Sequence, residues 1–316
     1  MQAYIARRLL LMIPSLIGVT VIVFLAARLA PVSTVNVILG ETGIRDEAIA
    51  AEVSERLGLN SSLITQYTNW VWGMIRGDFG ESWFTGTSVG GELARRLPVS
   101  LELGALALLL SVVVAIPIGA LSAIRQDTWL DYASRGSAIF LLSIPTFWIG
   151  ILVVGLGYYF FTWAPPAEYK SIIEDPSAHI RLMFWPVVVL GINLAGTKMR
   201  LVRSSLLEVL RQDYVRTARG KGLNERTVIF QHAMRNALIP VVTVIGLQLP
   251  LVVAGSVVLE SIFLVPGIGR YAVEASTRYD FPVMQAIVVL VAFAIMISNL
   301  VIDISYALLD PRIRYN

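Results

Sequence analysis

The chain of 316 residues has no cysteine, two histidines and few charged residues. The lack of cysteine excludes disulfide bonds and thiolate metal sites, and two histidines leave little scope for a histidine-ligated metal or histidine-based catalysis. Charged residues make up 15% of the chain, against about 25% in an average soluble domain. Hydrophobic residues make up 56%, with a mean hydropathy of +0.71. Because a globular surface must stay solvated, the composition predicts an all-α polytopic membrane protein.

Long uncharged stretches predict six transmembrane helices. A bilayer core about 30 Å thick needs about 20 helical residues. The fourth stretch is short and spans the bilayer only if Lys198 extends its ammonium group to the interface. The first stretch could be a cleaved signal peptide, but it is longer than such segments usually are, so a retained helix is expected. The stretches are residues 9–27, 103–124, 136–167, 182–197, 236–259 and 281–302.

A seventh uncharged stretch, 57–75, is rich in Asn, Ser, Thr and Gln. Hydrocarbon does not tolerate that polar load, so we expect a helix outside the bilayer with Trp70 and Trp72 at its boundary. The segment 31–98 around this stretch carries eight acidic residues. It predicts an extracytoplasmic helical subdomain, which is either a solvated cap or a docking platform for an outer partner.

The distribution of lysine and arginine predicts the orientation. With the N-terminus in the cytoplasm, the inner segments carry 15 of these residues and the short outer loops carry 4. Cytoplasmic loops are enriched in Lys and Arg, so both termini are expected to be cytoplasmic. The net charge of +3 is thus a topology signal, because a nucleic-acid interface would need a basic face on a soluble module. The predicted parts are an N-terminal transmembrane helix (1–30), the outer subdomain (31–98) and a five-helix core (99–316) with a cytoplasmic loop (203–236).

The 203–236 loop carries seven basic and three acidic residues. Its sequence predicts that the preceding span continues as a helix to Leu210, followed by a short helix from Asp213. Gly222 suits the left-handed end of that helix, and Asn224 can cap the next helix, 225–236. Such a unit is either a rigid element through which a partner moves both attached spans, or only a basic loop that fixes topology.

Two motif matches carry little weight. Residues 191–198 resemble a phosphate loop, but Thr197 separates its glycine from its lysine, and the segment lies in an apolar span. Ser88 lies in a Gly-x-Ser-x-Gly pattern, yet no buried strand precedes it, and only His179 could act as its base. Neither ATP hydrolysis nor serine hydrolysis is therefore expected of this chain.

Polar groups within the spans are sparse. The carboxylates of Glu102, Glu260 and Asp303 lie at span edges, and a carboxylate at mid-membrane is missing, which weakens the case for an ion-coupled carrier. The remaining polar residues fit either a water-filled path for a polar solute or hydrogen bonding between helices. Candidate pathway residues are Ser143, Asn193, Thr243, Gln248 and Ser256.

Several motifs together resemble the permeases of ABC importers, and in particular their dipeptide/oligopeptide branch. The clearest is DYVRTARGKGL (213–223) in the 203–236 loop, followed by HAMRNALIP (232–240), which runs past the end of the loop. Others follow in the family's order along the whole chain: Gly77–Gly80, Arg96–Glu102, Glu260–Phe263, Pro266–Gly269 and Asp310–Arg314. Two features depart from the family pattern: Arg216 and Thr217 replace Glu and Ala, and the distance from Gly222 to Pro240 is longer than in the consensus.

The resemblance implies a type I ABC-importer permease in the plasma (inner) membrane of a prokaryote. Members work with a second related permease, two cytoplasmic ATPases that bind ATP and Mg, and an extracytoplasmic solute-binding protein; the permease itself has no cofactor, metal or catalytic residue. Expected solutes are di- and oligopeptides or related small solutes. The resemblance places a gate loop at Glu260, Pro266 and Gly267. It places ATPase contacts at Asp213, Tyr214, Arg216, Thr217, Ala218, Arg219, Lys221, Gly222, Leu223 and Asn224.

Overall fold

The computed structural model describes residues 2–29, 61–254 and 256–309. Within these ranges all regular secondary structure is helical, apart from one isolated bridge between Glu81 and Ser88. The predicted all-α class is confirmed. The predicted outer subdomain lies partly outside the described residues, and so does the side chain of Asp303.

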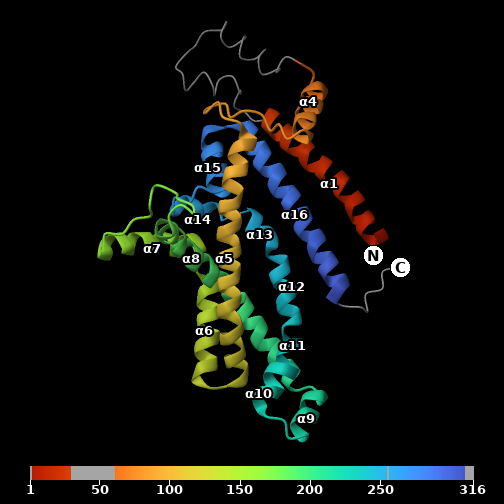
Figure 1. The fold of residues 1–316 in the computed structure, drawn as a ribbon, viewed down its shortest axis with the longest axis vertical. Helices are drawn as coiled ribbons and strands as arrows, with labels where there is room; N and C mark the ends of the chain where they lie inside the picture. The colour runs from red at the N-terminus through yellow and green to blue at the C-terminus, as the bar shows by residue number, and fades with distance from the viewer. Residues whose placement is uncertain (1, 30–60, 255, 310–316) are drawn as a thin grey trace. The chain divides into compact units, whose positions relative to one another are not determined.

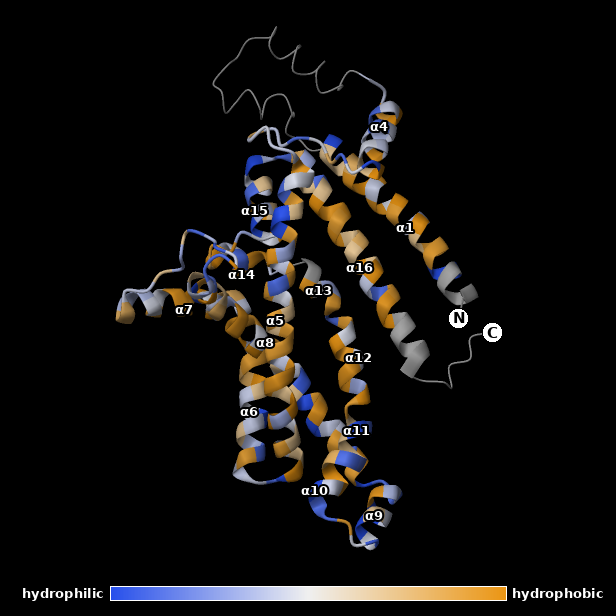
Figure 2. Cartoon of the chain, in the orientation of Figure 1, coloured by the Kyte–Doolittle hydropathy of each residue, from blue (hydrophilic) through white to orange (hydrophobic). Residues whose placement is uncertain are grey.

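Four described helices are long and apolar enough to cross a membrane. They are α1 (Gln2–Arg28), α5 (Val89–Ile124), α8 (Pro176–Leu210) and α16 (Phe281–Leu309). Figure 2 shows the apolar residues that dominate these helices. Each of them covers one of the uncharged stretches that predict the spans.

The other two predicted spans are bent. Helices α6 (Trp129–Ser143) and α7 (Thr146–Phe161) meet at 94°. Pro145 explains this bend, because it forces Ile144 into an extended conformation (φ −98°, ψ 126°) that ends the helix. The stretch 136–167 is therefore not the single straight helix that its composition suggests. The described part of the chain holds six candidate spans only if each bent pair counts as one, so the number six stays a prediction.

The second bent pair follows the 203–236 loop. It starts with α10 (Glu225–Thr227), π-helix η1 (Val228–Ala233) and α11 (Met234–Ala237), and a 42° bend leads into α12 (Ile239–Leu247). The predicted helix 225–236 thus forms, but its middle turn is a π-helix. After Gln248 the chain continues as α13 (Leu249–Ala254).

The chain divides into two compact units, residues 1–99 with 266–316 and residues 100–265. In the first unit α1 lies beside α16 (Figure 1). Helix α4 (Leu63–Ile75) forms within the polar stretch predicted to be helical, and it packs on α1. The Tyr67 hydroxyl lies 2.9 Å from the Thr20 hydroxyl, and the Phe24 ring contacts the rings of Tyr67 and Trp70.

The second unit is held together by close contacts between α5, α6 and α8. Ala115, Ala138, Ala195 and Met199 form a buried cluster among these helices. At Gly119 a β-carbon would lie 2.7 Å from the carbonyl oxygen of Met199 and 2.8 Å from Cβ of Val202. Small residues of this kind let transmembrane helices approach closely, which strengthens their van der Waals contact.

We expect Gly119→Ala to destabilise the chain by about 1–3 kcal/mol, because the added methyl group must push α5 away from α8. Gly136→Ala is the matched control, since Gly136 lies in α6 and nothing lies within 4 Å of the place that its β-carbon would take. That variant should be neutral or gain up to about 1 kcal/mol from helix propensity. Thermal unfolding in detergent measures both, and equal midpoints for the two variants would contradict the packing described here.

Candidate functional site

The 203–236 loop begins as an extension of α8, which continues without a break to Leu210. A tight turn leads into α9 (Asp213–Gly220). Helix α9 ends at a left-handed glycine, Gly222 (φ +78°), where the amide of Leu223 donates to the carbonyl of Ala218 over 3.4 Å. The Asn224 side chain then accepts a hydrogen bond from the amide of Arg226 at 3.0 Å. Both sequence predictions for this turn, the left-handed Gly222 and the Asn224 cap, are confirmed.

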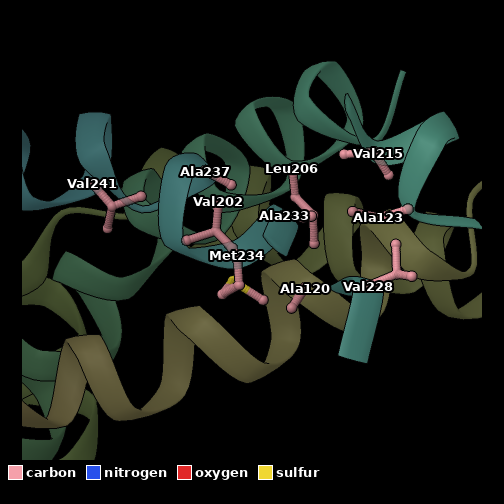
Figure 3. Close-up of a cluster of buried hydrophobic side chains, with 11 residues drawn as sticks. Ala120, Ala123, Val202, Leu206, Val215, Val228, Ala233, Met234, Ala237 and Val241 are labelled. Atoms are coloured by element: carbon pink, nitrogen blue, oxygen red, sulfur yellow. The ribbon is translucent and has the colours of Figure 1, made fainter. Parts of the chain in front are cut away.

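A hydrophobic cluster fixes α9 to the helices around it (Figure 3). Val215 of α9 and Val202 and Leu206 of α8 are fully buried in this cluster. It joins α5, α8, α9, η1, α11 and α12 within the second unit. Because these side chains are closely packed, α9 is anchored to α8 and η1. The cluster consists of Ala120, Ala123, Val202, Leu206, Val215, Ala218, Val228, Ala233, Met234, Ala237 and Val241.

The opposite face of α9 is exposed and charged. The side chain of Asp213 is 96% exposed and that of Arg216 is 81% exposed. Of the ten residues predicted to contact a partner, only Ala218 is buried, because it faces the hydrophobic cluster. The exposed ones are Asp213, Tyr214, Arg216, Thr217, Arg219, Lys221, Gly222, Leu223 and Asn224.

Two polar contacts set the shape of the loop. The Arg219 guanidinium donates to both carboxylate oxygens of Glu225, at 2.7 and 3.2 Å, and spans the Gly222 turn. This hydrogen bond raises the pKa of Arg219. The Asn236 amide donates to the Tyr214 hydroxyl at 2.8 Å. Helix α9 is thus tied to the segments that follow it on its polar side as well.

A buried ion pair lies close to this loop, and sequence reasoning missed it. Arg203 of α8 donates to both carboxylate oxygens of Asp131 on α6, at 2.6 and 2.7 Å. Asp131 is fully buried and also accepts from the Ser122 hydroxyl of α5 at 2.6 Å and from the Asp127 amide at 3.0 Å. In the sequence, Arg203 contributes only to the count of basic residues that predicts the membrane orientation. The only available signal was the acidic first turn of α6, which does not identify a partner 72 residues away.

Three of the five predicted pathway residues make local or packing contacts through their side chains. The hydroxyls of Ser143 and Thr243 donate to carbonyls of their own helices. Asn193 of α8 donates to the carbonyl of Leu141 on α6 at 3.0 Å, which joins two helices. Ser256 immediately precedes α14 (Val257–Ile262). These contacts match the packing alternative, and a place in a pathway stays a prediction for all four.

Gln248, the fifth, has a charged partner. Its side-chain oxygen accepts a hydrogen bond from the ammonium of Lys198. The expectation that Lys198 extends to the membrane interface is therefore wrong. The side chain is fully buried and also donates to the Leu194 carbonyl one turn earlier in α8, at 3.3 Å.

The predicted gate residues lie in different units. Glu260, on α14, is fully buried, and its carboxylate accepts a hydrogen bond from the Ser100 hydroxyl at 2.9 Å. Pro266 and Gly267 belong to the other unit, where Gly267 precedes the first turn of α15 (Ile268–Arg278). Their role in a gate stays a prediction.

The rejected catalytic motifs have structural roles. Ser88 lies beside the start of α5, where its hydroxyl lies 3.4 Å from the Gly91 amide nitrogen, and a turn rather than a buried strand precedes it. His179 is held by Glu102, with Nε2 2.8 Å from the carboxylate, and by the Lys170 carbonyl at 3.0 Å from Nδ1. The segment 191–198 is α-helical within α8 and therefore forms no phosphate loop.

Comparison with known proteins identifies the family. The family described as "Binding-protein-dependent transport system inner membrane component" matches residues 115–315. The dipeptide transport system permease protein DppB of Escherichia coli K12 is 37% identical over 341 residues, which cover 100% of this chain and 99% of that protein. The oligopeptide transport system permease protein AppB of Bacillus subtilis 168 is 36% identical over 318 residues, and this alignment covers 100% of both chains.

Among solved structures, the chain is similar to that of an amino acid ABC transporter with histidines. The sequence identity is 16% and the TM-score is 0.49, over 71% of this chain and 94% of that one. The family match and the curated relatives agree with the motifs, the apolar helices and the helix–glycine–helix loop. This chain therefore belongs to the inner-membrane permease components of binding-protein-dependent transport systems.

Proposed function

We propose that this chain is one of two permease subunits of an ATP-driven importer for di- and oligopeptides. The support for the solute class is that the similar proteins of Escherichia coli and Bacillus subtilis are named dipeptide and oligopeptide permeases. The proposed partners are a second related permease, two cytoplasmic ATPase subunits that bind ATP and Mg, and an extracytoplasmic binding protein. In this proposal the chain supplies the path and the mechanical link, and it performs no covalent chemistry.

The proposed topology has six spans with both termini in the cytoplasm. The excess of lysine and arginine in the inner loops supports this orientation. It exposes α9 to the cytoplasm, where the ATPases are, and it directs Glu260, Pro266 and Gly267 to the outer side, where the binding protein delivers solute.

The observation that carries the proposal is that helix α9 of the 203–236 loop has one exposed polar face and one buried apolar face. Helix α9 exposes its polar face at Asp213 and Arg216, and its apolar face is buried against α8 and η1 through Val215 and Ala218. An ATPase that moves on binding ATP can dock on the first face, and the second face passes the movement into the spans. An ion-coupled carrier has no use for such an element.

Reconstitution tests this function. Proteoliposomes that contain this chain, the second permease and the ATPases should take up labelled alanine peptides when ATP is inside and the binding protein is outside. Omission of the ATPases or of the binding protein should abolish uptake. Uptake that continues without ATPases, driven by a proton or sodium gradient, would refute the proposal in favour of an ion-coupled carrier.

A further inference from the structure

Lys198 is a cationic side chain inside a transmembrane helix, and the activity described so far gives it no role. Its side chain has no exposed surface within the chain. The two acceptors that it contacts, the Gln248 side-chain oxygen and the Leu194 carbonyl, are both uncharged. Among the described residues no ion pair involves it.

The ammonium of Lys198 lies on the side of the predicted uncharged stretch 182–197. Lys198 lies twelve residues, or about 18 Å of helix, before α8 ends at Leu210. Its hydrogen bond to the Leu194 carbonyl shows that the side chain runs toward the N-terminal end of α8, away from Leu210.

Its partner marks the middle of the fifth span. Gln248 is twelve residues after the start and eleven before the end of the uncharged stretch 236–259. The helix is interrupted there, since α12 ends at Leu247 and α13 starts at Leu249. Solute sites in many transporters lie near the bilayer midplane, beside interrupted helices of this kind.

A buried ammonium without a counter-ion is costly, and charges within transmembrane segments usually mark the path of an ion or solute. An arriving anion would supply the missing charge. It would also favour the charged form of the amine, because an opposite charge nearby stabilises it. A peptide always brings such a group, since its terminal carboxyl is ionised at neutral pH.

We propose that Lys198 binds the carboxylate of the transported solute on its way through the membrane, and that Gln248 occupies the ammonium when no solute is there. The inference rests on the proposed function and makes it more specific, since it requires a solute that carries a carboxylate. The bland alternative is that Lys198 only pins the interrupted helix through Gln248, a role that needs a hydrogen bond but no solute.

Three variants in the reconstituted transporter provide the first test, with labelled alanine peptides as the probe. Lys198→Met should lower the uptake rate by about tenfold or more, because it removes a hydrogen bond to a charged group. Lys198→Arg, which keeps the charge, should retain most of the activity. Lys170→Met in the loop before α8 is the matched control and should change uptake by less than about twofold. ATP hydrolysis stimulated by the binding protein should continue in all three, which confirms that each complex is assembled.

The lack of cysteine allows a chemical test of the charge itself. Lys198→Cys places a single thiol in this chain, which is then assayed with partner subunits free of cysteine. Modification by 2-aminoethyl methanethiosulfonate during turnover restores a primary ammonium on a side chain of similar length and should restore uptake. Methyl methanethiosulfonate adds a neutral group and should not. Mass spectrometry measures the extent of both reactions.

The outcomes separate the two proposals. Three outcomes would overturn the role of Lys198 and leave the importer intact, provided that the wild-type complex takes up peptide. Lys198→Met could take up peptide as fast as the wild type, both reagents could restore uptake equally, or neither reagent could reach the thiol during turnover. Absence of peptide uptake by the wild-type complex would instead overturn the proposed function, and this inference with it.

Discussion

Asp131→Asn is expected to lower the free energy of unfolding of the detergent-purified chain by about 3 kcal/mol. The substitution keeps the shape of the side chain but removes the charge that Arg203 meets at 2.6 and 2.7 Å. Asp131 is fully buried and Arg203 is 20% exposed, so water replaces little of the lost interaction. Thermal unfolding with circular dichroism provides the measurement.

An exposed ion pair in the same unit is the matched control. Arg219 and Glu225 form a similar two-pronged contact, but their side chains are 43% and 55% exposed. Glu225→Gln should therefore cost less than about 1 kcal/mol. The double variant Asp131→Asn/Arg203→Met should recover part of the loss, because it removes the unpaired charge as well. Equal losses for Asp131→Asn and Glu225→Gln would show that burial does not govern the strength of these pairs.

Gly222→Val is expected to lower solute uptake by the reconstituted transporter by about tenfold, with membrane insertion unchanged. Gly222 has φ +78°, a conformation that costs an L-residue about 1–2 kcal/mol and a β-branched one more. The turn should relax to avoid this strain, which breaks the bond from the Leu223 amide to Ala218 and changes the direction of α9. Parallel assays of uptake and ATP hydrolysis provide the measurement.

Two further variants, one at Gly222 itself and one at the nearby Gly220, control for this effect. Gly222→Asn should be milder, because asparagine tolerates the left-handed conformation. Gly220→Ala should have little effect, since Gly220 is the last residue of α9 and nothing lies within 4 Å of an added β-carbon. The account of the turn is wrong if Gly222→Val transports normally, or if Gly220→Ala is equally impaired.

The features that follow from local sequence were predictable. The left-handed turn at Gly222 and the cap at Asn224 depend on residues a few positions apart, and both are confirmed. The long apolar helices also follow from composition, because hydrocarbon accepts little else. The bend before Pro145 also follows from local sequence, because the residue before a proline disfavours the helical conformation. The prediction missed it because it treated 136–167 as one long uncharged stretch.

The features that depend on tertiary contact were not predictable. The short uncharged stretch before Lys198 predicts that its ammonium lies at the interface, and the sequence gives no sign of its partner Gln248, 50 residues away along the chain. Asp131 and Arg203 were seen as separate charges for a similar reason, and no periodicity in one helix encodes the partner on another. The inward position of Ala218 was missed because a motif names residues without saying which face of the helix each one occupies.

Photo-crosslinking from α9 tests the central claim most directly, namely that this helix is where the ATPase acts on the permease. Benzoylphenylalanine replaces Arg216, whose side chain is 81% exposed, and in a control it replaces Ile173, which is 91% exposed in the loop between α7 and α8. We predict an adduct with the ATPase subunit from position 216, with a yield that changes when ATP is added, and none from position 173. An ATPase adduct from position 173, with none from position 216, would contradict the account.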